Sequence, residues 1–247
     1  MIDYSGKKHI FSSQKKKSSP LRSFLLIVLI LVGLFVIKGI NSQDIKLTTA
    51  MTVPTPTRSF NSFAQEGETH FQAGNMEKAI DAYQKAIEIS PEDAELRAEL
   101  ARIQVYSTTQ ITLDADKQKR LEEALSTIDA GLKINPQSST LYAVRAFALD
   151  WYGSTGITGE KWQEYLVKAE QAATEALQYD NTNALALAYY SEVLIDQQKW
   201  SQAQQYIMQA LERDSSLMDI HRVNGYVLES TENYLQAIEE YKKAIAI

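Results

Sequence analysis

The sequence contains no cysteine among its 247 residues. Disulfide bridges and thiolate metal sites are therefore excluded, although this absence does not identify a compartment. Histidine is scarce as well, with His9, His70 and His221 the three present. His70 and His221 have no carboxylates at metal-ligand spacing, and His70 is expected to be a packed or surface helix residue. We predict no metal site.

The motifs of the common catalytic sites are also missing. The sequence has no H-E-x-x-H, no G-x-S-x-G, no Walker loop and no dinucleotide fingerprint. Gly153, Gly156 and Gly159 lack the Lys-Ser/Thr pair of a phosphate loop, so a flexible turn is expected there. Asp114 and Asp116 lack the other ligands of a calcium loop and favour the start of a helix. We predict a protein that is not an enzyme, uses no cofactor and has no evident small-molecule substrate.

Charge is distributed unevenly along the chain. The formal net charge is -6, but residues 1–40 carry seven lysines and arginines against Asp3, which leaves -12 for the rest. Nucleic-acid phosphates need a basic surface. The acidic part of the chain is therefore a poor candidate for binding nucleic acid.

One long apolar run interrupts the basic N-terminal part. Phe24 to Ile37 has no charge, and counting through Ile40 gives 17 residues interrupted by Lys38. A helix of that length spans about 25 Å, below the ~30 Å hydrocarbon core but within the range of membrane helices. We predict a transmembrane signal anchor at 23–40. A cleaved signal peptide is the alternative, disfavoured because no small-x-small site follows the run.

The segments on either side of this run complete the predicted N-terminal organisation. Residues 1–22 form a basic disordered tail, and residues 41–59 form a Thr/Pro-rich linker. The positive-inside rule then puts the N-terminus in the cytoplasm and the later residues outside it. The prediction is a single-pass membrane protein.

A repeated unit organises the rest of the chain. In Gly74–Pro91, Ala79, Tyr83 and Ala86 stand at i, i+4 and i+7 and share one face of a helix. Two alanines on that face let a partner helix come close. Ser90 and Pro91 are expected to end this helix and to start the next, with Ser90 as its N-cap.

The same pattern returns four more times. The first alanine recurs at Ala79, Ala124, Ala169, Ala203 and Ala237. The residue between the two small positions is Tyr83, Ile128, Ala173, Ile207 or Tyr241. Upstream, a small residue recurs at Gly67, Ala101, Ala146, Ser191 and Gly225. The spacings are 45, 45, 34 and 34 residues, and 45 is 34 plus an insertion of 11.

A period of 34 with small, aromatic and proline positions in this order resembles the tetratricopeptide repeat (TPR) family. The resemblance covers 60–247, as units 60–93, 94–138, 139–183, 184–217 and 218–247. It departs from the family where Asn181 and Ser215 replace the closing proline. It implies an all-α fold, a right-handed TPR solenoid of antiparallel helix pairs preceded by one transmembrane helix.

The resemblance also implies a binding surface, because in this family the first helix of each pair lines a concave groove. Carrying those positions across gives the candidate partner-binding residues Phe71, Arg102, Tyr106, Phe147, Asp150, Trp151, Glu192, Arg222 and Tyr226. Further groove positions are Ala64, Glu68, Ala98, Val105, Ala143, Ala188, Ile195 and Glu229. The Lys and Asn set that clamps a C-terminal carboxylate in some members is absent.

The expected function is a membrane-anchored scaffold or adaptor that binds protein or peptide segments. One alternative is the substrate-recognition part of a larger enzyme, such as a hydrolase, with its catalytic domain beyond residue 247. Another is an assembly factor of secretion or envelope machinery. We expect more chain, or a partner, to cover the last unit, which lacks a polar capping helix.

The two 11-residue insertions suggest a further surface. They are expected to emerge on one edge and to form a composite lip that contacts a partner or a membrane. The equal alternative is that Trp151 and Trp162 anchor a longer helical hairpin.

Overall fold

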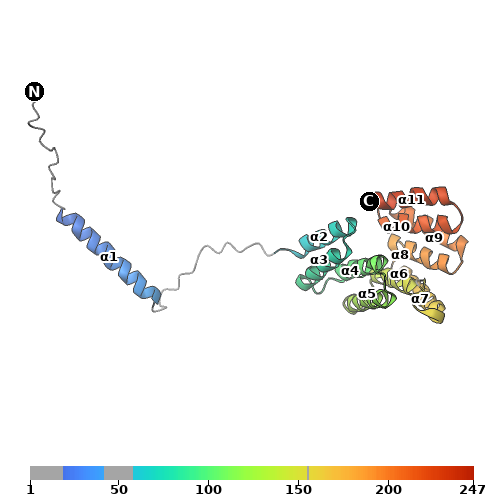
Figure 1. The fold of residues 1–247 in the computed structure, drawn as a ribbon, viewed down its shortest axis with the longest axis horizontal. Coiled ribbons are helices and arrows are strands. Elements are labelled where there is room, and N and C mark those ends of the chain that lie inside the picture. Colours follow the sequence, from blue (N-terminus) through green and yellow to red (C-terminus); the bar gives the residue numbers. More distant parts are fainter. Residues whose placement is uncertain (1–18, 42–57, 155) are drawn as a thin grey trace, which may run out of the picture. The chain divides into compact units, whose positions relative to one another are not determined.

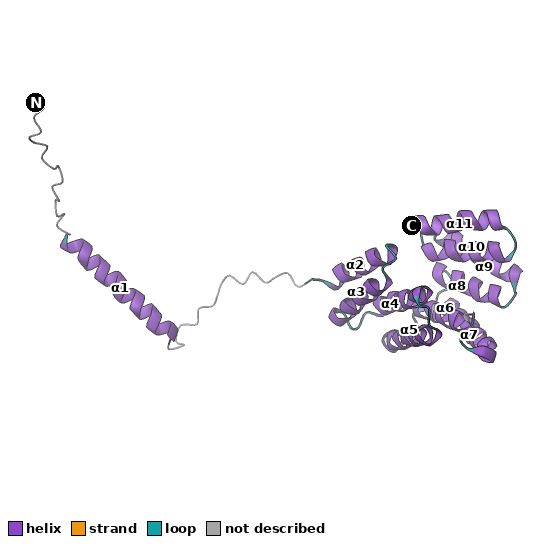
Figure 2. Cartoon of the chain, viewed as in Figure 1, coloured by secondary structure: helices purple, strands orange, loops and turns teal. Residues whose placement is uncertain are grey.

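The computed structural model describes residues 19–41, 58–154 and 156–247, which fall into two compact units divided after Thr57 (Figure 1). Helices account for all regular structure in these ranges, and no strand occurs in them (Figure 2). The predicted basic tail, except for residues 19–22, and most of the predicted Thr/Pro-rich linker lie outside the described residues.

The described part of the first unit is one helix, α1 (Pro20–Asn41). Ser19 precedes it and accepts hydrogen bonds from the Arg22 backbone N–H through both its carbonyl oxygen (2.9 Å) and its hydroxyl (3.4 Å). Proline at the first helical position needs no hydrogen-bond partner for a backbone N–H. Phe24, Leu29 and Phe35 of α1 are among the large apolar side chains that are exposed.

The predicted membrane anchor is corrected by the structure. Within the described residues, no helix combines the length and the apolarity that a membrane crossing requires. The uncharged run from Phe24 to Ile37 has 14 residues, and 14 residues of helix extend about 21 Å, well below the ~30 Å hydrocarbon core. Arg22 and Lys38 bound that run. The transmembrane helix at 23–40 and the single-pass localisation derived from it are therefore wrong.

Within residues 58–154 and 156–247 the second unit has ten α-helices. They are α2 (Phe60–Gln72), α3 (Met76–Ile89), α4 (Ala94–Ser107), α5 (Asp114–Ile134), α6 (Ser139–Ser154), α7 (Trp162–Tyr179), α8 (Ala184–Asp196), α9 (Trp200–Arg213), α10 (Met218–Ser230) and α11 (Tyr234–Ala246). Two short 3-10 helices, η1 (Thr108–Gln110) and η2 (Gly159–Lys161), occupy the insertions.

Consecutive helices pack as five pairs, from α2 with α3 to α10 with α11. The first helices of successive pairs also contact one another, α4 with α6, α6 with α8 and α8 with α10. Figure 1 shows the resulting curved stack. We call the sides of α2, α4, α6, α8 and α10 that enclose its interior the inner face.

Side-chain caps fix where most first helices begin. Ser59, Asp93 and Asn183 each accept a hydrogen bond from a backbone N–H in the first turn of α2, α4 and α8. Ser138 does the same for α6 through the Leu141 N–H. The expected start at Ser90 is three residues early, because the Asp93 carboxylate satisfies two free N–H groups there and Ser90 satisfies none.

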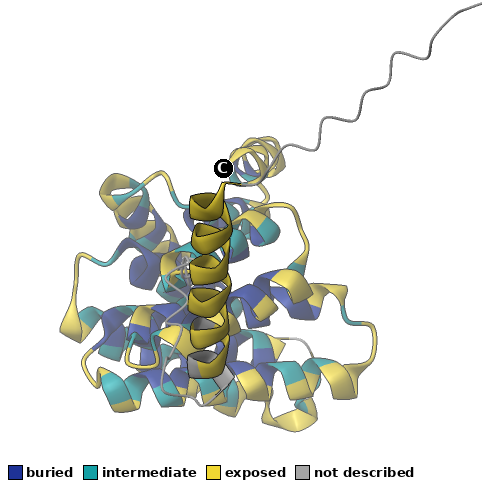
Figure 3. Ribbon diagram, turned by 90° about the vertical axis from the view of Figure 1, so that its left-hand side faces the viewer, coloured by how far each residue is buried: buried dark blue, intermediate teal, exposed yellow. Residues whose placement is uncertain are grey.

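The repeated alanines lie where two helices touch. Each of the five stands on the second helix of its pair and is buried. Figure 3 shows buried residues on the helix faces that meet and exposed residues on the opposite faces. Most buried apolar side chains join one continuous core that runs from α2 to α10.

The small residue on the first helix of a pair and the central residue on its second helix are complementary in size. A Cβ atom on Gly67 would lie 2.5 Å from the Tyr83 ring, and one on Gly225 would lie 2.6 Å from the Tyr241 ring. In the second pair, alanine at 101 accompanies the smaller Ile128. Glycine is therefore required where the partner is tyrosine.

We predict that Gly67→Ala destabilises the protein by about 1–3 kcal/mol through overpacking, although alanine favours a helix by about 1 kcal/mol. Adding Tyr83→Ile recreates the combination at Ala101 and Ile128 and should recover most of the loss. Urea unfolding of the wild type, both single variants and the double variant measures this coupling. Strictly additive effects would contradict the size match.

Candidate partner-binding site

The structure places the nine candidate partner-binding residues on the inner face. Phe71 comes from α2, Arg102 and Tyr106 from α4, Phe147, Asp150 and Trp151 from α6, Glu192 from α8, and Arg222 and Tyr226 from α10. Six of them are buried, and Trp151, Arg222 and Tyr226 are partly buried. Hydrogen bonds, ion pairs and ring contacts join most of them to one another.

A buried ion pair joins the second helix pair to the fifth. Arg102 Nη1 donates to Asp219 Oδ2 at 2.9 Å, across 117 residues of sequence. Arg102 also donates to Glu99 Oε2 from Nε and Nη2 at 2.9 and 2.8 Å. Asp219 Oδ1 accepts from the hydroxyls of Tyr106 (2.5 Å) and Tyr189 (2.6 Å). The carboxylate thus has three donors, in keeping with its burial.

These donors control the ionisation of Asp219. Burial alone would raise its pKa, but Arg102 and Arg222 and the two tyrosine hydroxyls outweigh burial and hold the pKa below its ordinary value. Asp219 also lies in the first turn of α10, where the helix dipole favours a negative charge. Asp219 is therefore ionised at neutral pH.

A second ion pair lies beside the first. Arg222 donates to both oxygens of Glu192, at 2.7 and 2.6 Å, and its Nε donates to the Tyr106 hydroxyl at 2.8 Å. Trp151 Nε1 donates to Glu192 at 3.2 Å. Tyr106 therefore connects the two ion pairs, since it donates to Asp219 and accepts from Arg222.

Aromatic rings surround both arginines. Phe147 stacks on Tyr189 with centroids 4.4 Å apart and planes 3° from parallel. Phe147 also contacts Tyr106 and Trp151, each at 5.1 Å between centroids. The Arg222 guanidinium lies over the Phe147 ring at 5.2 Å, and that of Arg102 lies over Phe71 at 4.8 Å. Cation–π contacts of this kind stabilise a desolvated guanidinium.

This network of ion pairs and rings fills the centre of the inner face and leaves a cavity at each end. The larger cavity, about 710 Å³, includes Phe71, Arg102 and Tyr106 in its lining. The smaller one, about 250 Å³, includes Asp150, Trp151, Glu192, Arg222 and Tyr226. Phe147 is fully buried between them. Ala98, Val105, Ala143, Ala188 and Ile195 are also buried, as parts of the helix packing.

Two carboxyl groups of the smaller cavity are perturbed. Burial raises the pKa of Asp150 well above its ordinary value, and the neighbouring Asp196 and Glu192 raise it further, whereas Arg222 opposes them. Burial raises the pKa of Asp196 to about 6, with Glu192 adding to it and the Tyr226 hydroxyl, 2.5 Å away, lowering it. These neighbouring carboxyl groups therefore retain protons at higher pH than free aspartates do.

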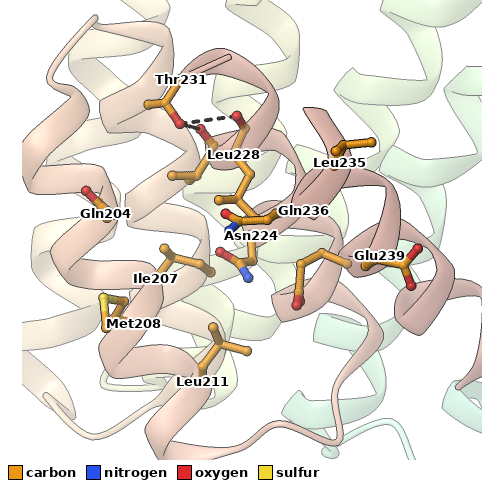
Figure 4. A pocket seen from close by; sticks show the side chains of 12 residues that line it. Gln204, Ile207, Met208, Leu211, Asn224, Leu228, Thr231, Leu235, Gln236 and Glu239 are labelled. Atoms are coloured by element: carbon orange, nitrogen blue, oxygen red, sulfur yellow. Dashed lines mark hydrogen bonds between the residues drawn. The ribbon is translucent and has the colours of Figure 1, made fainter. Parts of the chain in front are cut away.

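A third cavity, of about 500 Å³, lies between α9, α10 and α11 and contains none of the nine candidates. Figure 4 shows Met208 and Leu211 of α9 facing Leu228 and Leu235 across it. Its lining combines apolar and amide side chains, and its two charged residues, Glu239 and Glu240, are both acidic. Among the described residues, no group of three or more His, Asp or Glu could hold a metal ion.

The structure separates the two tryptophans that border the second insertion. Trp151 is part of the network on the inner face, whereas Trp162 begins α7 and borders a different cavity with Leu166 and Val167. Ile157 packs against the main core. The composite lip stays a prediction.

The sequence analysis missed Asp219, Tyr189 and Asp196. Asp219 lies in the first turn of α10, where an acidic residue usually serves the helix dipole in solvent. Tyr189 follows the groove position at Ala188, and Asp196 ends α8. No local sequence signal distinguishes these residues, because their partners come from helices distant in sequence.

Comparisons with known proteins agree with this helical stack. The model of the TPR repeat matches residues 67–105. The structure of TTC0263, a thermophilic TPR protein from Thermus thermophilus, is similar with a TM-score of 0.60 and 19% identity, over 76% of this chain and 91% of that one. The sequence matches none of the curated proteins with which it was compared.

Two other solved structures are similar at lower TM-scores. PilF from Pseudomonas aeruginosa has a TM-score of 0.42 and 23% identity over 75% of this chain and 74% of its own. YrrB, a TPR protein with an unusual peptide-binding site, has a TM-score of 0.39 and 16% identity over 77% of this chain and 87% of its own. The fold assignment therefore depends on the first comparison. Residues 67–105 match the TPR repeat, and the described helices of the second unit have the fold of a TPR-like solenoid.

We predict that Asp219→Ala destabilises the protein by about 3–5 kcal/mol, because it leaves Arg102 buried without its main partner. Asp129→Ala is the matched control, since it removes an aspartate that pairs with Arg145 at the surface, and should cost no more than about 1 kcal/mol. Guanidinium unfolding at neutral pH measures both. Equal losses would show that the bridge between α4 and α10 contributes little.

We also predict a pH dependence from the smaller cavity. Because burial raises the pKa of both groups, the native state holds protons on Asp150 and Asp196 that the unfolded chain has released. Their contribution to stability therefore grows as pH falls through the Asp196 pKa of about 6 toward the unfolded value of about 4. Asp219 acts in the opposite sense, but its contribution is lost below its unfolded pKa of about 4, outside this window. Unfolding free energies of wild type and an Asp150→Asn/Asp196→Asn variant should therefore diverge as pH changes. Parallel curves would contradict the assignment.

Proposed function

We propose that the chain is a non-catalytic TPR scaffold that binds a segment of a protein partner in the larger cavity of the inner face. The supporting observation is the cavity itself, about 710 Å³ in volume and bordered by residues from every first helix of the second unit. Sites of this size take an extended peptide or a few anchoring side chains.

The lining indicates the chemistry of the partner. Phe71, Met76, Leu185, Leu217 and Met218 offer apolar contacts. Such side chains, aromatic ones and methionine above all, are enriched at protein interfaces. A partner segment with apolar anchors fits this surface.

The charges of the lining favour a basic partner. Glu68, Glu95, Glu99 and Asp219 border the cavity, with Arg102 as the one basic side chain among its described lining residues. Arg102 is already held by Asp219 and Glu99. The uncompensated charge is therefore negative, so lysine or arginine beside the apolar anchors would complement it.

The test is an array of short peptides probed with the full-length chain. We expect retention of peptides that carry lysine or arginine next to large apolar residues. Met218→Arg combined with Glu68→Lys places positive charge in the cavity and should weaken their binding by at least about tenfold. The matched control is Met208→Arg combined with Glu212→Lys on α9, which should bind as the wild type does.

Three outcomes would refute the proposal. The array could retain no peptide, it could retain acidic and basic peptides equally, or the control variant could lose as much binding as the cavity variant. Circular dichroism of both variants confirms that the helices remain formed.

A further inference from the structure

The smaller cavity contains a buried acid with no hydrogen-bond donor. Asp150 is 1% exposed, and neither of its carboxyl oxygens has a hydrogen-bond partner. The cavity that it borders, of about 250 Å³, lies at the opposite end of the network from the larger cavity. A buried carboxylate without a donor is costly, so this site requires a proton or a cation.

Charge balance within the cavity favours a cation. Glu192 is neutralised by the two bonds from Arg222, at 2.7 and 2.6 Å. Asp196 accepts from the Tyr226 hydroxyl at 2.5 Å, a neutral donor. Among the ion pairs of the described residues, none includes Asp150 or Asp196. Two acidic groups thus border the cavity without a positive partner.

The helices and rings around the cavity add to this preference. Asp196 is the last residue of α8, so the negative end of that helix dipole lies at the cavity, and Asp150 lies four residues before the end of α6. Trp151, Tyr226 and Tyr241 supply aromatic walls. Aromatic ring faces attract organic cations, and the tyrosine hydroxyls accept their hydrogen bonds.

We propose that this cavity binds the cationic head of an organic amine or guanidine, with Asp150 and Asp196 as its two anionic partners. Its volume is below the roughly 300 Å³ at which pockets for drug-sized ligands begin, so it suits one side chain or a small amine. The site differs from the larger cavity and does not depend on the peptide binding proposed there.

Entry of the cation replaces a proton. Without a bound cation, burial and the neighbouring carboxylates keep the Asp150 carboxyl protonated. When an alkylammonium ion enters, Asp150 releases that proton to solvent and its carboxylate accepts the ammonium N–H groups. The total charge is conserved, because one proton leaves for each cation bound. Affinity therefore rises with pH.

The test is calorimetric titration of the full-length chain with n-butylammonium and n-butylguanidinium, with n-butanol as the neutral probe of equal chain length. We expect both cations to bind with affinities of roughly millimolar or tighter, and butanol not to bind. Nα-acetyl-lysine methylamide distinguishes the two possible sources of the cationic group. Its binding indicates a side chain of a peptide, and its exclusion indicates a free amine. Titrations in two buffers of different ionisation enthalpy count the released proton.

The matched variants are Asp150→Asn and Asp196→Asn, each expected to weaken the cations by at least about tenfold because a charge-assisted bond is lost. The amide introduced by Asp150→Asn retains the shape of a protonated carboxyl. Glu212→Gln makes the same charge change on the exposed surface of α9 and should leave binding unchanged.

The proposal is overturned if butanol binds as well as the cations, if neither cation binds in the millimolar range, or if both Asp variants bind as the wild type does. The comparison of cation with butanol uses the wild type alone. It therefore decides the question even if a variant fails to fold.

Discussion

The contact on which the inner face depends is the buried ion pair between Arg102 and Asp219. It connects α4 to α10 directly, although two helix pairs separate them in sequence. Two desolvated charges are stable there because Tyr106, Tyr189 and Glu99 supply the remaining hydrogen bonds. The same network occupies the centre of the inner face. It thereby determines where cavities remain and which charges face them.

The helical repeat could be predicted from the sequence because its cause is local. Within each unit the first alanine and the residues four and seven positions later follow the 3.6-residue period of a helix, and the alanines at 79, 124, 169, 203 and 237 are all buried. The membrane anchor predicted from the apolar run at 24–37 was wrong, because 14 uncharged residues of helix are short for the ~30 Å hydrocarbon core. The predicted start of the helix that follows Ser90 was three residues too early. The Asp93 carboxylate, and not Ser90, accepts the hydrogen bonds of the first backbone N–H groups of α4.

The candidate site could be predicted only in part. Family spacing selected residues that do meet on one face, such as Tyr106, Phe147 and Arg222. It could not show that they would satisfy one another, because hydrogen bonds across more than a hundred residues depend on how tightly the stack curves. Asp219 was overlooked for that reason, and Asp196 because its partner, Tyr226, lies on another helix 30 residues away. Their roles follow from neighbours on other helices, not from their own positions along a helix.

The size matching between glycine and tyrosine has a consequence for how the chain finds its native pairing. Five similar amphipathic helices could each dock on the wrong companion during folding. Tyr83 and Tyr241 are admitted only where a glycine leaves room, whereas position 191 holds a serine whose hydroxyl bonds to the Ala203 carbonyl at 2.7 Å. The size of these side chains thus distinguishes the first and fifth helix pairs from the three between them. It also disfavours the exchange of helix pairs between neighbouring molecules.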